Sequence, residues 1–203
     1  MNCTLCVSAN IELFQVVGEK KYSRCGECGL IFLQSQYWLT PEQEFKRYQL
    51  HQNQPTQGYL DYLTPVIDMV RSEMPTGSRG LDYGCGPDPV LANELMGCGF
   101  QMSVWDPYFY NQSEVVDSRR EYDFITCTEV IEHLREPAKT FEHLKSLLKQ
   151  SGKVFLQTQL YRSGVDFKNW HYRRDTTHIC FYTTETMAWI RDRYQLPIRQ
   201  PGL

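Results

Sequence analysis

The sequence predicts an α/β protein built on a doubly wound, mostly parallel sheet. Short apolar runs have the length and composition of buried strands, at 79–83, 101–105, 122–127 and 153–158. Segments with helical spacing of apolar residues alternate with them, at 89–96, 137–149 and 184–194. This alternation is typical of a parallel sheet with helices on both faces. A glycine turn directly after the first strand is the third observation, because such sheets bind ligands at that edge.

The glycine turn lies within Asp82–Gly86, between a strand and a helix. Glycine has no Cβ, so Gly84 and Gly86 let the backbone approach a ligand closely. The following helix directs its unpaired N–H groups toward the same place. Asp106 ends the next strand, and an acid there can accept hydrogen bonds from both hydroxyls of a ribose. Together these residues predict a nucleoside-binding crevice at the carboxyl ends of the strands.

The next strand ends in Thr128-Glu129, and Glu132-His133-Leu134 follows it. With the glycine turn, this order resembles the class I S-adenosylmethionine-dependent methyltransferases over about residues 60–200. The resemblance implies a Rossmann-like fold and S-adenosyl-L-methionine as cofactor. The residues it assigns to the cofactor are Asp82, Gly84, Cys85, Gly86, Asp106, Pro107, Thr128 and Glu129.

One residue departs from the family pattern. Asp88 stands where the family usually has a third glycine. We expect Asp88 to cap the next helix, with Pro89 in its first turn. Its negative charge near the cofactor's carboxylate would weaken cofactor binding without changing the fold.

The N-terminal segment has the cysteine spacing of a zinc ribbon. Two Cys-x-x-Cys pairs, Cys3/Cys6 and Cys25/Cys28, supply four thiolates for one structural Zn²⁺. The alternative is a pair of disulfides, or a site that has lost its metal. Acidic and basic residues balance in this segment, so a structural role, or help in closing over substrate, is favoured over nucleic-acid binding.

Composition fits one globular domain with a small appendage, since the 203 residues are 41% apolar and 22% charged. We predict a zinc ribbon at 1–35, a helical lid or linker at 36–76 and the methyltransferase-like core at 77–203. Thr40 and Gln43 predict a capping box at the first lid helix. In the resembled family such helices lie over the cofactor, so His51 is a candidate ligand-facing residue. A weak strand is expected at 114–116.

The segment after the last core strand is rich in aromatic and hydrogen-bonding residues. In the resembled family this region builds the acceptor pocket, so Trp170 and Tyr172 are candidate substrate-binding residues. His178 is the candidate general base, with Asp175 three residues earlier as the acid that orients it. The alternative is that His178 is a structural histidine that ties the loop to the next helix.

A zinc ribbon in front of this core resembles bacterial methyltransferases that act on sugars or small metabolites, and the features above favour such a small-molecule acceptor. The net charge of -3 argues against a nucleic-acid partner. Two alternatives stay open: a zinc-finger ribosomal-RNA methyltransferase, and a non-catalytic adaptor, which Asp88 favours. We expect no membrane span, because no run of about 18 apolar residues occurs. The N-terminus lacks a charged-then-apolar leader, so a cytoplasmic location is expected.

The C-terminal residues contain Pro197 and Pro201, and each proline removes a donor from a sheet ladder. We therefore expect 196–203 to form at most a short edge strand, so that the sheet lacks its final strand. If these residues instead pair with a second chain, the protein is a homodimer.

Overall fold

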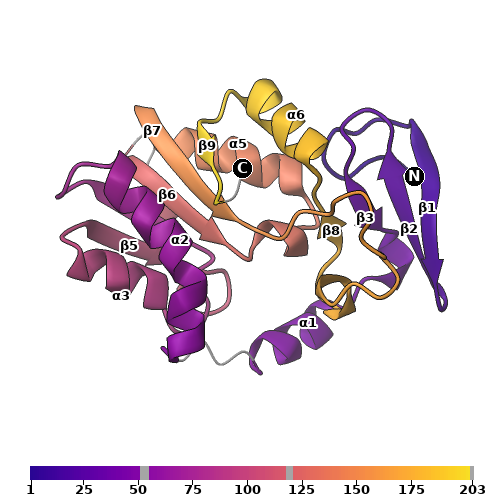
Figure 1. Cartoon of the computed structure of the whole chain (residues 1–203), viewed down its shortest axis with the longest axis horizontal. Helices are drawn as coiled ribbons and strands as arrows, with labels where there is room; N and C mark the ends of the chain where they lie inside the picture. The colour runs from indigo at the N-terminus through magenta and orange to yellow at the C-terminus, as the bar shows by residue number, and fades with distance from the viewer. Residues whose placement is uncertain (51–54, 118–120, 202–203) are drawn as a thin grey trace. The chain divides into compact units, whose positions relative to one another are not determined.

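The computed structural model describes residues 1–50, 55–117 and 121–201 (Figure 1). The chain forms two compact units. The first contains Met1–Glu44, Ile131–Glu142 and Thr158–Gln195; the second contains Phe45–Val130, His143–Gln157 and Leu196–Leu203. The boundaries predicted from the sequence, 1–35, 36–76 and 77–203, follow the chain consecutively, whereas each unit is assembled from three separate segments. Those boundaries stay a prediction.

The second unit is built on a parallel sheet with the strand order β5-β4-β6-β7-β9. The strands are β4 (Arg79–Tyr83), β5 (Gln101–Trp105), β6 (Tyr122–Thr128), β7 (Leu148–Gln157) and β9 (Ile198–Arg199). The mostly parallel, Rossmann-like sheet predicted from the sequence is confirmed. Its carboxyl ends bring the glycine turn after β4 and the last residues of β5 and β6 to one edge.

Two helices cover this sheet with apolar side chains. They are α2 (Gln57–Glu73), which lies across the sheet in Figure 1, and α3 (Val90–Gly97). Thr56 caps α2, because its hydroxyl accepts a hydrogen bond from the backbone N–H of Tyr59 at 3.4 Å. The helices and strands share a buried core that contains Leu63, Val66, Val70, Val90, Leu91, Leu95, Phe100, Phe124 and Phe155. This packing fixes the sheet edge that carries the polar residues.

The structure corrects three local expectations. The helix expected at 137–149 ends at Leu147, and β7 begins at Leu148 instead of near residue 153. The strand expected at 114–116 is the short helix α4 (Ser113–Asp117), because two valines are too few to distinguish strand from helix periodicity. Asp88 does not cap the next helix. Pro89 occupies the cap position with a ψ of 60°, so α3 begins at Val90 and Asp88 lies one residue too early.

The C-terminal residues behave as the prolines predict. β9 contains two residues and pairs in parallel with the edge of β7. Pro197 contributes only its carbonyl, which accepts a hydrogen bond from Val154 N at 3.1 Å. Among residues 196–201, which the structure describes, the chain therefore forms one short edge strand. Pairing with a second chain stays a prediction.

The first unit contains a four-stranded antiparallel sheet with the order β1-β2-β3-β8. The first three strands come from the cysteine-containing segment: β1 (Ile11–Val17), β2 (Lys20–Cys25) and β3 (Ile31–Leu33). The fourth, β8 (Cys180–Phe181), comes from the segment after β7 and lies beside β3 (Figure 1). The cysteine-containing segment and the predicted acceptor segment therefore share one sheet.

Helices complete the first unit. They include the 3₁₀ turns η1 (Ser35–Tyr37), η2 (Ile131–His133) and η3 (Tyr172–Arg174), the helix α6 (Thr184–Tyr194) and parts of α1 (Pro41–Tyr48) and α5 (Pro137–Leu147). The predicted capping box of α1 is confirmed. Thr40 N donates to Gln43 Oε1 at 3.0 Å, and Gln43 N donates to Thr40 Oγ1 at 3.3 Å. In the part of the chain that the structure describes, no helix is both long and apolar enough to span a bilayer.

Candidate functional site

The glycine turn after β4 is closed against the end of β5. Gly84 and Gly86 have φ values of +80° and +68°, which favour glycine. Gly84 N donates to Trp105 O at 2.7 Å. A Cβ on Gly84 would lie 2.4 Å from Cγ2 of Val130, so no larger residue fits without movement. The turn is therefore a backbone cradle between β4 and the residues after β6.

Two buried acids flank this cradle. Asp82 accepts a hydrogen bond from Thr126 Oγ1 at 2.8 Å. Burial raises the pKa of Asp82 to about 6, the Thr126 hydrogen bond opposes this rise, and the charge of Asp106 adds to it. A cationic group bound nearby would favour the ionised form of Asp82.

Asp106 ties the loop after β5 to the glycine turn. Its Oδ2 accepts from Gly86 N at 3.1 Å, while Oδ1 accepts from Tyr108 N at 2.9 Å and Phe109 N at 3.1 Å. Pro107 and Cys85, the other residues assigned to the cofactor here, lie in these two loops. Asp106 is thus placed at the strand end that the sequence predicted.

The carboxyl ends of β6 and β7 carry polar atoms that a ligand would satisfy. Thr128 and Gln157 are paired in register, and Thr128 Oγ1 and Gln157 Oε1 are both buried without a hydrogen-bond partner among the described residues. Glu129 follows with a φ of +53°, a strained conformation for a residue with a Cβ. Its Oε1 accepts from Tyr62 OH at 2.6 Å. Strain and unpaired buried atoms at one edge indicate a binding site.

A second polar cluster lies in the first unit. Glu132, His133 and His178 each place one potential ligand atom within 4.8 Å of the others. His178 Nδ1 lies 2.7 Å from Tyr172 O, and His133 Nδ1 lies 3.2 Å from Thr177 O. Because a carbonyl oxygen only accepts, each Nδ1 carries the hydrogen. The lone pair of each neutral ring is therefore on Nε2.

Glu132 is fully buried, and its carboxylate is held by two hydroxyls. Tyr172 OH donates to Oε1 at 2.6 Å, and Thr158 Oγ1 donates to Oε2 at 3.1 Å. A buried carboxylate is costly unless a positive charge compensates it. His133 Nε2 lies 3.9 Å from Glu132 Oε1, within reach of such a compensating interaction. Two imidazoles and a carboxylate also form a ligand set that a divalent cation could use.

The residues predicted to form the acceptor pocket lie in different environments in the structure. Asp175 Oδ1 accepts from Thr177 N at 2.9 Å and from Thr177 Oγ1 at 2.6 Å, so it closes the turn before His178. Tyr172 is buried and contacts Glu132, while Trp170 packs its ring 5.2 Å from that of Tyr172. His51 lies outside the described residues.

Glu132 and Thr158 are functional candidates that sequence reasoning missed. In the sequence, Glu132 was noted only as part of a family motif, next to His133, and no role was predicted for it. Its contact with Tyr172 joins residues far apart in the chain, and no spacing rule could have indicated it.

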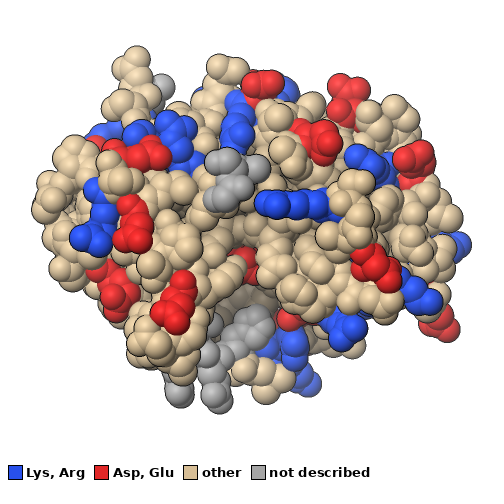
Figure 2. Space-filling model, viewed as in Figure 1, with Lys and Arg blue, Asp and Glu red and all other residues tan. Residues whose placement is uncertain are grey.

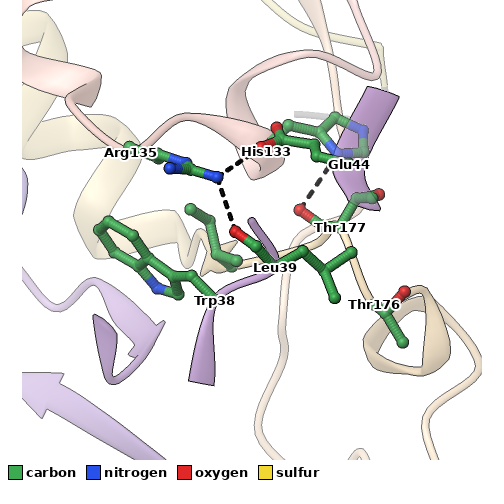
Figure 3. A pocket seen from close by; sticks show the side chains of 8 residues that line it. Trp38, Leu39, Glu44, His133, Arg135, Thr176 and Thr177 are labelled. Carbon is green, nitrogen blue, oxygen red and sulfur yellow. Dashed lines mark hydrogen bonds and ion pairs between the residues drawn. The ribbon is translucent and has the colours of Figure 1, made fainter. Parts of the chain in front are cut away.

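A small pocket opens beside His133 (Figure 3). Its wall includes Trp38, Leu39, Glu44, Arg135, Thr176, Thr177 and Ile179. Arg135 Nη2 donates to Leu39 O at 2.8 Å and to Glu44 Oε2 at 2.7 Å. The guanidinium charge is therefore already balanced by Glu44.

The four N-terminal cysteines converge in the first unit. Cys3 Sγ lies 3.6 Å from Cys28 Sγ, Cys6 Sγ lies 3.4 Å from Cys25 Sγ, and all four atoms lie within 4.8 Å of one another. A tetrahedral zinc with bonds of about 2.3 Å holds its sulfurs ~3.8 Å apart, whereas a disulfide requires about 2.05 Å. The donor set therefore fits zinc, which stays a prediction.

The two Cys-x-x-Cys pairs, Cys3/Cys6 and Cys25/Cys28, are called the first and second knuckle, and they have the same local geometry. Leu5 N donates to Cys3 Sγ and Glu27 N donates to Cys25 Sγ, both at 3.4 Å. Such hydrogen bonds favour the thiolate that a metal needs. In addition, the hydrogen bond with the Cys28 thiol lowers the pKa of Cys3 to about 5, while the same hydrogen bond, followed by burial, raises the pKa of Cys28.

Comparison with known proteins decides the family. A family model described as a methyltransferase domain matches residues 57–200, which is more than half of the chain. The chain belongs to this methyltransferase domain family. Membership of this family accounts for the glycine turn and the acids beside it.

Curated relatives of this methyltransferase are ubiquinone biosynthesis O-methyltransferases. The protein from Paraburkholderia phymatum is 30% identical over 142 residues, covering 60% of this chain and 57% of the relative. The one from Thiobacillus denitrificans is 28% identical over 144 residues, covering 60% and 57%. The chain thus spans less than two thirds of the length of the curated relatives it matches.

A solved structure shows the fold. The phosphoethanolamine N-methyltransferase 2 of Haemonchus contortus, in complex with S-adenosyl-L-methionine, superposes with a TM-score of 0.53 at 16% identity. The match covers 79% of this chain and 42% of that chain. The methyltransferase domain described here therefore shares the fold, while its acceptor must be argued from its own residues.

The residues at the sheet edge of this methyltransferase fit S-adenosylmethionine. The cofactor carries a ribose, a sulfonium and an ammonium group, so acids at strand ends and a glycine turn without side chains are suitable partners. The buried Thr128 Oγ1, without a partner among the described residues, is one atom that a bound cofactor would satisfy.

We expect Asp106→Ala to weaken S-adenosylmethionine binding by roughly 1–3 kcal/mol, because a charged hydrogen bond to the ribose is lost. Isothermal calorimetry on the purified chain measures this. Asp123→Ala is the matched control, since Asp123 accepts from Arg79 N at the opposite end of β6. Equal losses in the two variants would contradict a ribose contact.

Proposed function

We propose that this methyltransferase transfers the methyl group of S-adenosylmethionine to a hydroxyl oxygen of a small-molecule acceptor. The convergence of a buried carboxylate and two oriented imidazoles in Glu132, His133 and His178 carries the proposal. A hydroxyl must lose its proton during methyl transfer, and histidine is the usual proton acceptor near neutral pH. The similarity to curated O-methyltransferases supports the same choice of oxygen.

Bound S-adenosylmethionine would supply the methyl group and would be left as S-adenosylhomocysteine, as the acceptor's new carbon–oxygen bond replaces the carbon–sulfur bond. The hydroxyl proton passes to Nε2 of His178, because its Nδ1–H is directed to Tyr172 O. The buried charge of Glu132 stabilises the resulting imidazolium. Asp175, which binds Thr177, shapes the loop that presents His178.

Zinc enters the proposal in a structural role only. Bound to Cys3, Cys6, Cys25 and Cys28, it would hold the ribbon and take no part in the reaction.

A small molecule is favoured over nucleic acid as the acceptor. Basic and acidic side chains are interspersed over the face of the molecule in Figure 2, so the described residues there form no extended basic patch. Together with the net charge of -3, this is the opposite of the footprint that phosphate binding requires.

The proposal is tested by turnover on a defined panel. The purified chain, loaded with zinc, is incubated with methyl-labelled S-adenosylmethionine and a panel of phenols, catechols, sugars and a ribosomal-RNA transcript. We expect S-adenosylhomocysteine to form together with an O-methylated small molecule. Methylated RNA, together with RNA binding that weakens steeply as the salt concentration rises, would favour a ribosomal-RNA methyltransferase instead. Cofactor binding without any methylated product would favour an adaptor.

A further inference from the structure

A single residue, Ile179, connects the cysteine-containing sheet to the Glu132–His133–His178 cluster through its backbone N–H and C=O groups. Leu33 N, in β3, donates to Ile179 O at 2.8 Å. Ile179 N donates to Glu132 O, also at 2.8 Å. Ile179 directly follows His178, so the backbone next to the proposed base is fixed on one side by β3 and on the other by Glu132.

The second cysteine knuckle packs on the helix that follows β8. Gly29 comes directly after Cys28, and a Cβ there would lie 3.3 Å from Thr183 Oγ1 and 3.4 Å from Thr186 Oγ1. Thr183 caps α6, because its hydroxyl accepts from Thr186 N at 3.2 Å. The knuckle therefore contacts the chain immediately after β8, and the segment from His178 to the start of α6 is held at both ends.

Aromatic side chains join the same two parts of the first unit. The ring of Tyr22, in β2, lies 5.0 Å from that of Phe167 and 5.9 Å from that of Phe181. Phe167 and Phe181 lie 5.2 Å apart. All three residues are buried. The cysteine-containing sheet and the acceptor segment thus share one hydrophobic core, and neither buries it alone.

The strands that make this connection are too short to persist by themselves. β3 contains three residues and β8 contains two. A ribbon of this size has little core of its own, so its order would depend on a metal bound by the four predicted thiolates. Loss of that metal would release β3, and with it the hydrogen bond to Ile179.

We propose that metal occupancy of the four-cysteine site controls the position of His178 through the β3–β8 pairing. The cysteine site then regulates the acceptor cluster without touching the acceptor. The consequence for turnover rests on the proposed function. The positional control does not, because it concerns only hydrogen bonds within the first unit.

Hydrogen exchange of the full-length chain tests this control directly. Cys28→Ser removes one metal ligand, and Cys98→Ser, outside the four-cysteine site, is the matched control. We expect the amides of Leu33 and Ile179 to exchange on the order of 100-fold faster in Cys28→Ser, with Leu81 and Ile125 of the parallel sheet unchanged. A protected Ile179 beside an exchanging Leu33 would overturn the proposal. Loss of protection in Leu81 and Ile125 as well would also overturn it, since the metal would then support the whole fold.

Coupling is reciprocal, so a change in β8 must weaken metal retention. Phe181→Leu alters β8 without touching a cysteine, and Phe155→Leu is a control at a buried phenylalanine of the second unit. We expect a colorimetric chelator to remove zinc about tenfold faster from Phe181→Leu than from Phe155→Leu. Equal rates would overturn the coupling. Both measurements are independent of turnover, so failure of the proposed function would leave their outcomes unchanged.

Discussion

Replacing His178 by alanine is expected to lower kcat by about 10²–10⁴-fold while leaving the affinity for S-adenosylmethionine nearly unchanged. The imidazole is the proposed proton acceptor, and its ring is oriented by the carbonyl of Tyr172. The residues predicted to bind the cofactor belong to the other unit, at the ends of β4, β5 and β6. Steady-state kinetics and calorimetry measure the two quantities separately.

The exposed His171 provides the matched control, because it lies in the same segment. His171→Ala should keep kcat within about twofold of the native value, as surface substitutions usually do. Tyr172→Phe removes a hydrogen bond to Glu132 and should shift the acidic limb of the pH–rate profile, a change that a purely structural role would not produce. Unaltered kcat in His178→Ala would contradict the role of His178 as the base.

Removing two of the cysteine thiolates is expected to abolish zinc binding and to unfold the first unit. The native chain should contain about one zinc per molecule. In Cys3→Ser/Cys28→Ser the zinc content should fall to background, and the free energy of unfolding should fall by several kcal/mol, because structural zinc contributes roughly 10 kcal/mol or more on binding. Elemental analysis and urea unfolding of the full chain measure the two effects.

The single variant Cys98→Ser should keep the zinc and most of the stability, since Cys98 is not among the four converging cysteines. The zinc prediction is contradicted if the native chain contains no metal, or if mass spectrometry finds the four cysteines in two disulfides.

The local elements followed from the sequence alone. The bounds of β4, β5 and α6 agree with the predicted 79–83, 101–105 and 184–194. Each of these elements has strong periodicity or a clear cap, such as Thr183 before α6. Predictions from shorter sequence patterns were wrong: residues 114–116 lie in a helix, and Asp88 does not cap α3.

Some features of the candidate site also followed from the sequence, and others did not. The sequence by itself determined the glycine turn, the strand-end acid Asp106 and the four converging cysteines, because neighbouring residues or a fixed spacing encode each of them. Only the tertiary structure brought Glu132 to His178 and added β8 to the cysteine-containing sheet. These contacts join segments far apart in the chain, and they depend on shared burial and backbone pairing, which no local pattern records.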